Sequence, residues 1–250
     1  MNTHMLAYAA AALDASAGDV QLNAVSDQVF TIANNNFQMR ENMQIVGAYA
    51  GGVTATRFRF QVASLRNTGF PQIWPFALVI QPVDNPQFMD LSEKPLLIPK
   101  LEELRCDVTN TAANNANVIA ILRNSPVNKN INTPNLRWVR FTAAVVGIAN
   151  GWSPPIAASF QENLAAGSYS VYGMAVSGTA INAARINFPD QLYRPGCLGL
   201  ATMGLRSHPL FEGNLGLWGR FNTYSLPSIE AFTSAAGAVT VVGNMLIGRD

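Results

Sequence analysis

The second half of the sequence repeats the first, and this repeat limits the folds that the chain can adopt. Phe37 and Gln38 recur as Phe160 and Gln161 half the chain later. Further matches keep the same order: Gly47 with Gly173, 57–60 with 185–188, 85–88 with 208–211, and 105–110 with 229–234. One such match is weak, but an ordered series in 250 residues predicts two copies of one fold.

Short alternating segments predict that this fold is all-β. Residues 54–62 alternate between apolar and polar side chains, as a half-buried strand does, and similar segments follow between clusters of Asn, Gly and Pro. The chain also has 14 prolines, which break long helices. We therefore expect two β-sandwiches or barrels in tandem.

The repeat also predicts the domain boundaries. Residues 124–135 are the most polar and turn-rich stretch, so we place a linker there, between a first unit at 21–135 and a second at 136–250. Residues 1–20 form an N-terminal arm in this division. Its Ala-rich part, 5–17, contains no Gly or Pro and stops at Gly18, which predicts a short helix. The alternatives are a frayed arm and an arm that docks on a neighbour or a lipid surface.

The charge composition favours a protein that packs against itself. Only 12% of the residues are charged, against about 25% in ordinary globular proteins, and the net charge is +1. Such a surface repels its own copies little. The chain has no basic run, so we expect no direct, sequence-specific binding of nucleic acid.

A search for catalytic chemistry finds no set of residues that could carry it. His4 and His208 are the only imidazoles, so metal sites built on histidine clusters are excluded. Pro209 follows His208, which predicts a turn there. No nucleotide-binding motif occurs. Glu102 and Glu103 are adjacent acids whose side chains would point to opposite faces of a strand, which disfavours a glycosidase pair. We predict no enzyme activity, no cofactor and no metal.

The cysteines and the N-terminus indicate the compartment. Cys106 and Cys197 are the only cysteines, and we expect two free, buried thiols. Asp14 interrupts the N-terminal apolar run, no basic flank precedes it, and no window is long and apolar enough to span a bilayer. We expect a soluble protein made in the cytoplasm without a signal peptide.

Four residues are candidates for contacts between subunits or domains. Arg57 and Arg185 occupy matching positions in the two copies, and we expect both on strand faces that meet a neighbouring domain. Trp74 and Trp218 are further candidates, because tryptophan fills cores and interfaces more often than it stacks on sugars.

These features together resemble the double jelly-roll major capsid proteins of tailless icosahedral bacteriophages, the PM2-like and FLiP-like phages among them. The resemblance is one of size and layout: a duplicated all-β unit, low charge, abundant Asn and Ala, and a short N-terminal helix. It implies two eight-stranded jelly rolls and no catalytic residues.

The resemblance also implies partners and a location. Three copies would form a pseudo-hexagonal capsomer, and capsomers would assemble with other capsid proteins, such as penton or spike proteins, into the shell of a virion made in the host cytoplasm. The N-terminal helix would be a candidate for the inner face, where members of the family often enclose a membrane. Two alternatives remain: a tandem β-sandwich that binds carbohydrate or a receptor as a spike, and a hydrolase with acids clustered between the units.

Overall fold

The computed structural model describes seven segments: residues 3–13, 19–51, 55–63, 88–110, 114–125, 135–200 and 207–250. The chain divides into two compact units. The C-terminal unit comprises residues 125–250 together with residues 1–5, and the N-terminal unit comprises residues 6–124. The predicted linker, 124–135, lies mostly outside the described residues.

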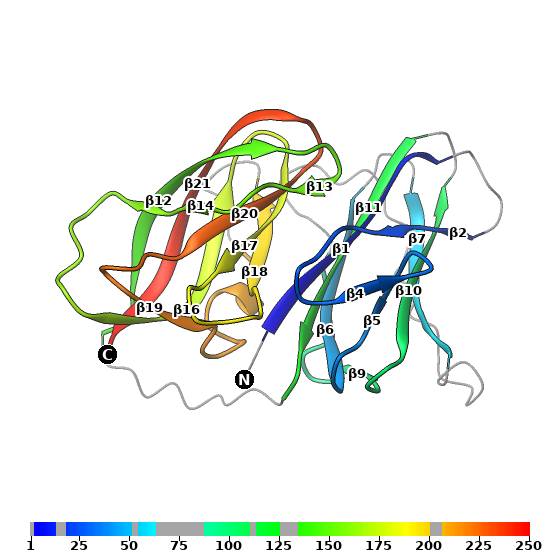
Figure 1. Cartoon of the computed structure of the whole chain (residues 1–250), viewed down its shortest axis with the longest axis horizontal. Helices are drawn as coiled ribbons and strands as arrows, with labels where there is room; N and C mark the ends of the chain where they lie inside the picture. Colours follow the sequence, from blue (N-terminus) through cyan, green and yellow to red (C-terminus); the bar gives the residue numbers. More distant parts are fainter. Residues whose placement is uncertain are drawn as a thin grey trace. The chain divides into compact units, whose positions relative to one another are not determined.

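The N-terminal unit consists of two antiparallel sheets (Figure 1). One sheet has the order β3-β1-β11-β6-β8, with β9 also on β6, and the other has the order β2-β10-β5-β4, with β7 on β10. The strands are β1 (Thr3–Leu13), β2 (Val20–Gln21), β3 (Asn23–Ala24), β4 (Thr31–Ala33), β5 (Asn36–Gln38), β6 (Met43–Gly51), β7 (Ala55–Val62), β8 (Phe88–Asp90), β9 (Leu96–Ile98), β10 (Glu103–Asn110) and β11 (Asn114–Arg123).

The C-terminal unit is one curled ten-stranded sheet. Its order is β13-β20-β17-β18-β16-β21-β12-β15, with β14 on β20 and β19 on β16. The elements are β12 (Arg137–Gly147), β13 (Gly151–Trp152), β14 (Ile156–Ala157), β15 (Ser159–Phe160), β16 (Ser168–Ser177), β17 (Ile181–Asn187), β18 (Gly196–Leu200), the 3-10 helix η1 (Pro209–Phe211), β19 (Gly219–Asn222), β20 (Ser228–Thr233) and β21 (Gly237–Arg249).

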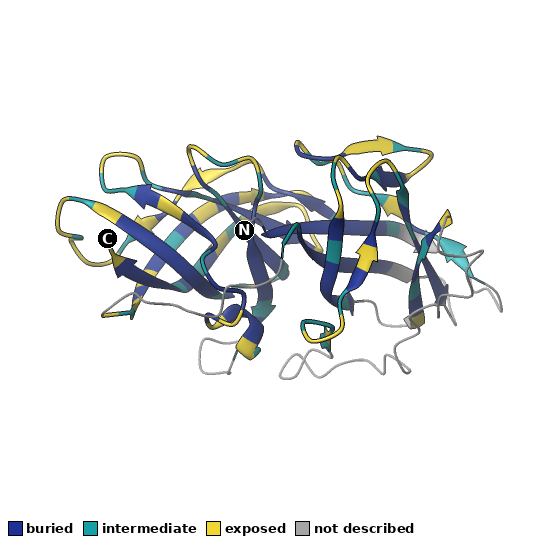
Figure 2. Ribbon diagram, turned by 90° about the horizontal axis from the view of Figure 1, so that it is seen from below, coloured by how far each residue is buried: buried dark blue, intermediate teal, exposed yellow. Residues whose placement is uncertain are grey.

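Burial alternates along several strands, and Figure 2 shows this as a change of colour along their ribbons. In β12, Val139, Phe141 and Val145 are buried and the residues between them are more exposed. In the N-terminal unit, Phe58 and Phe60 of β7 are buried. The segments predicted from alternation are thus strands with one face in a core.

The predicted N-terminal helix is wrong: the chain forms strand β1 at Thr3–Leu13. Met5 to Tyr8 are all fully buried, so both faces of this strand are covered. Alanine has a high intrinsic helix propensity, but tertiary burial overrides that preference when the apolar residues of a segment are covered on both faces. Residues 14–17 of the predicted helix lie outside the described residues.

The two units share one strand order, as the sequence repeat predicts. The first strand of each pairs with the last, and the last pairs with a long central strand: β1-β11-β6 in one unit and β12-β21-β16 in the other. The strand that follows the central strand pairs with the penultimate long strand, β7 with β10 and β17 with β20. The matches 57–60 with 185–188 and 105–110 with 229–234 therefore fall in or beside corresponding strands.

Phe88, in strand β8, and Phe211, in the 3-10 helix η1, both lie against a glycine of the long central strand in their unit. A side-chain carbon on Gly47 of β6 would overlap the ring of Phe88, and one on Gly173 of β16 would overlap the backbone carbonyl of Phe211. Each central strand thus uses a glycine to let the same downstream segment approach closely.

The match of Phe37 with Phe160 is wrong. Phe37 lies in β5 opposite Leu104 of the penultimate strand β10, whereas Phe160 lies in β15 opposite Phe141 of the first strand β12. The two segments are similar over a few residues, but they pair with different strands of their units.

We expect Gly173→Ala to lower the free energy of unfolding by roughly 1–3 kcal/mol, and Gly47→Ala to lower it less. The methyl group at position 173 meets a backbone oxygen, which cannot move without η1, whereas the methyl group at position 47 meets the tip of the Phe88 ring, which can rotate. Denaturant unfolding of both variants checks this. Equal midpoints for Gly173→Ala and the unchanged protein would contradict it.

Candidate functional site

A buried ionic cluster occupies the C-terminal unit. Arg185 of β17 lies directly opposite Glu230 of β20, and its Nε donates to Glu230 Oε2 at 2.6 Å. Arg194, just before β18, donates from Nη1 to the other carboxylate oxygen of Glu230. The three side chains are 2%, 2% and 7% exposed for Arg185, Glu230 and Arg194 respectively.

Two further groups complete this cluster. The Arg185 guanidinium carbon lies 4.1 Å from the centre of the Trp152 ring, a cation–π arrangement. Arg185 Nη1 also donates to the backbone carbonyl of Met5 at 3.2 Å. Both oxygens of Glu230 accept from guanidinium groups, so this carboxylate is committed to structure and is a poor general base or metal ligand.

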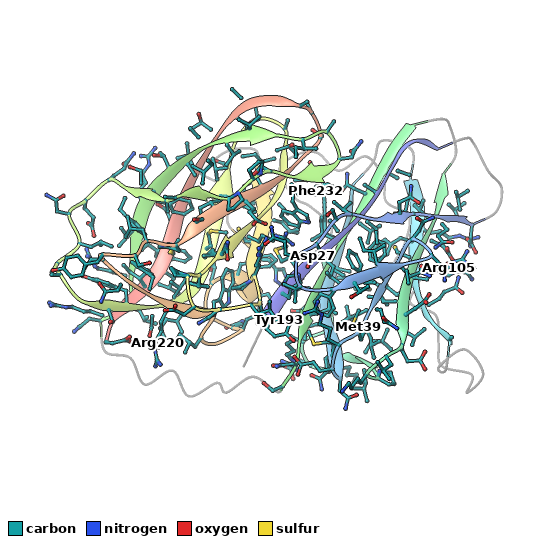
Figure 3. The ribbon with its side chains drawn as sticks, viewed as in Figure 1. Asp27, Met39, Arg105, Tyr193, Arg220 and Phe232 are labelled. Atoms are coloured by element: carbon teal, nitrogen blue, oxygen red, sulfur yellow. The ribbon has the colours of Figure 1, made fainter. Side chains whose placement is uncertain are left out.

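A related but more solvated cluster lies in the N-terminal unit. Asp107 of β10 is fully buried and pairs with Arg59 of β7 at 3.3 Å and with Arg105 at 2.7 Å. Arg59 also contacts Asp19 at 2.6 Å. The Arg59 and Arg105 side chains are 18% and 41% exposed, and Arg105 is labelled at the outer side of β10 in Figure 3.

The strand registers correct the predicted match of the arginines. Arg59, opposite Asp107, corresponds to Arg185, opposite Glu230. Arg57 lies opposite Thr109, and its Nε donates to the Thr109 hydroxyl at 3.0 Å. The sequence signal for this pairing is the opposite charge that Asp107 and Glu230 carry on the penultimate strand of each unit.

The placement of the four predicted contact residues changes their roles. Arg185 and Trp218 are 1% and 2% exposed, so they have almost no surface to offer a second copy. Arg57 keeps 48% of its side chain exposed. Trp74 lies outside the described residues. Of these four, Arg57 is therefore the described residue that retains exposed side-chain surface for a contact.

An apolar, nearly uncharged surface that sequence analysis missed lies on the outward side of β12 and β21. Trp138, Val146 and the adjacent Ile148 are 44%, 62% and 47% exposed. The remaining outward residues of the paired strands are Arg140, Thr142, Ala144, Ala238, Thr240, Val242, Asn244 and Leu246. We call these eleven residues the β12–β21 face. One of its eleven residues, Arg140, is charged, whereas roughly a quarter to a third of the residues on an ordinary surface are charged.

The alternation of β12 contained the signal for this face. Residues between the buried positions of an alternating strand are normally polar, but here Ala144, Val146 and Ile148 are apolar as well. A strand that is apolar on both sides while one side is exposed indicates a surface that meets another molecule.

Both thiols are buried and free, as predicted. Burial raises the pKa of the Cys106 thiol well above its ordinary value, with a further rise from the Asp107 carboxylate, and burial likewise raises the pKa of Cys197. A raised pKa keeps the thiol protonated and unreactive at neutral and mildly alkaline pH.

We therefore expect neither cysteine to react with a thiol-specific disulfide reagent at pH 8 in the folded protein, and both to react in denaturant. Absorbance of the released thiolate counts the reacted groups. Rapid labelling of either cysteine without denaturant would contradict the buried positions.

The described segments also bear on metals and membranes. Among their residues, no group of three or more His, Cys, Asp or Glu side chains is arranged to hold a metal ion. Within the same segments, no helix has the length and hydropathy needed to cross a membrane.

No protein-family model matches the sequence, and no curated protein matches it. Among solved structures, the chain is similar to the major capsid protein P2 of bacteriophage PM2, with 10% identity, a TM-score of 0.21, and coverage of 92% of this chain and 97% of that one.

Proposed function

We propose that the chain is a structural protein that binds copies of itself, and that it serves as the major capsid protein of an icosahedral virus. The β12–β21 face carries this proposal. Trp138, Val146 and Ile148 expose apolar surface on one face with a single charge. Burying such a face gains about 25 cal/mol per Å² of apolar area and removes few hydrated charges from water.

The strand order supports a further step, that each unit is a jelly roll. In the C-terminal unit, eight strands fall into two groups of four, β12/β21/β16/β19 and β13/β20/β17/β18. Eight strands in two such groups are the arrangement of a jelly roll. The described strands of the N-terminal unit follow the same order.

A chain with two similar units suits a closed ring of three copies. Three chains supply six similar units, and six similar units close a ring with near-sixfold packing and little strain. We propose that such homotrimers form the capsomers of a shell and that other capsid proteins, such as penton or spike proteins, complete it. Contact with an internal membrane is part of the same proposal.

A carbohydrate-binding or receptor-binding role is the alternative, and one observation favours it. Trp138 and Tyr224 are 44% and 87% exposed, and exposed aromatic rings are the groups that stack on sugars. Trp152 and Trp218 are buried at 8% and 2% exposed, which removes them from that role.

Light scattering of the purified protein over a concentration series separates the two functions. The capsid proposal predicts a species of three times the 26.9 kDa chain mass, and larger species as concentration rises. A monomer at all concentrations and physiological salt would reject the capsid role and favour the binding module.

A further inference from the structure

The first described residues of the chain are fixed inside the C-terminal unit. The Met5 amide donates to the carbonyl of Arg194 at 3.0 Å, and the Arg194 amide donates to Nδ1 of His4 at 3.0 Å. Arg185 Nη1 donates to the Met5 carbonyl at 3.2 Å. Thr3, His4 and Met5 are at most 1% exposed. We call Thr3 to Met5 the docked segment.

The bond from Arg194 defines the protonation of His4. A ring nitrogen that accepts from an amide N–H must carry a lone pair, so Nδ1 is unprotonated and the docked ring is neutral with its hydrogen on Nε2. Adding a proton to Nδ1 would replace this hydrogen bond with two opposed N–H groups.

The surrounding charges also oppose a proton on His4. Arg185 and Arg194 are the cations near the docked segment, and Glu230, which pairs with both, is the one carboxylate in that cluster. The ring of Tyr193, labelled in Figure 3, lies edge-on to His4 at 6.0 Å between ring centres and adds no negative charge at neutral pH. An imidazolium here would add a buried positive charge near Arg185 and Arg194, which opposes protonation.

We propose that His4 is an acid-sensitive latch: protonation of its Nδ1 releases the docked segment from the C-terminal unit. An exposed imidazole takes up a proton near pH 6.5, so the released segment gains a proton that the docked segment excludes. Release is therefore favoured as pH falls, because the state that binds more protons is favoured at lower pH. Docking is therefore fully stable above about pH 6.5 and weakens up to tenfold for each pH unit below it. This latch does not depend on the proposed capsid role.

Hydrogen exchange on the full-length protein at low concentration tests the latch. We expect the protection factors of the Met5 and Arg194 amides, corrected for the intrinsic effect of pH, to be constant from pH 8 to 7 and to fall about fivefold between pH 6.5 and 5.5. Amides in the β12–β21 pairing serve as the internal reference, because they should keep their protection.

Two variants assign the effect to His4. His4→Asn keeps an acceptor oxygen near the place of Nδ1 but does not titrate, so its protection should not change with pH. His208→Asn is the matched control: His208 is only partly buried, and its Nδ1 also accepts from a backbone amide, that of Leu210 at 3.2 Å. His208→Asn should keep the full acid response.

Constant protection in the unchanged protein down to pH 5, or the same acid response in His4→Asn, would overturn the proposal. If His4→Asn does not fold, nitrogen NMR of the unchanged protein measures the protonation of His4 and His208 as a function of pH. Protonation of His4 Nδ1 must coincide with the loss of protection at Met5; protonation while that amide stays protected would also overturn it.

Discussion

Replacing Val146 with glutamate should abolish association between chains while leaving each chain folded. Val146 is 62% exposed at the centre of the apolar end of the β12–β21 face, so a glutamate there is hydrated in the free chain. In an assembly it would be an unpaired charge buried against an apolar surface, which costs about 3 kcal/mol or more, roughly a hundredfold or greater loss of affinity. Sedimentation velocity measures the loss, and circular dichroism checks the fold.

Leu192→Glu is the matched control for this prediction. Leu192 is another exposed apolar residue, at 52%, and it lies in the loop between β17 and β18, away from the β12–β21 face. We expect it to leave association unchanged. If both variants lose association equally, the effect of the added charge is nonspecific. If Val146→Glu associates as the unchanged protein does, the β12–β21 face is not the contact.

Replacing Glu230 with glutamine should cost about 3–5 kcal/mol of folding free energy. The amide removes the charge that compensates Arg185 and Arg194, which are 2% and 7% exposed and cannot be hydrated where they lie. Chemical denaturation monitored by tryptophan fluorescence measures the loss, because Trp152 lies against Arg185.

Asp107→Asn gives the comparison in the other unit. Asp107 is as buried as Glu230, but its partners Arg59 and Arg105 are 18% and 41% exposed and keep access to water. We expect its cost to be smaller, about 1–3 kcal/mol. If Asp107→Asn lowers the free energy of unfolding more than Glu230→Gln does, access of the arginines to water does not reduce the cost of removing the carboxylate.

The sequence predicted the strands where a single local pattern was decisive. Alternation predicted a strand at 54–62, and the structure has β7 at Ala55–Val62; the same alternation is found in β12 at Arg137–Gly147. The same period of two placed Val139 and Phe141 on one face, which is the core face. These features depend on neighbouring residues alone.

Features that depend on distant residues could not be predicted in the same way. The Ala-rich segment 5–17 looks helical by propensity, but its described part, residues 5–13, lies in strand β1, where Met5 to Tyr8 are buried by other parts of the chain. Arg185 was predicted to meet a neighbouring domain, because the sequence does not show that Glu230, 45 residues away, lies opposite it. Pairing partners across a sheet are set by register, which short sequence matches do not fix.

Electron microscopy of the concentrated protein tests the capsid proposal most directly. The proposal predicts closed particles, or sheets of identical units, in which each capsomer has near-sixfold outline and contains three chains. Val146→Glu prepared in parallel should give none of these. Micrographs that show only dispersed single chains of the unchanged protein, at concentrations where light scattering finds no association, would contradict it.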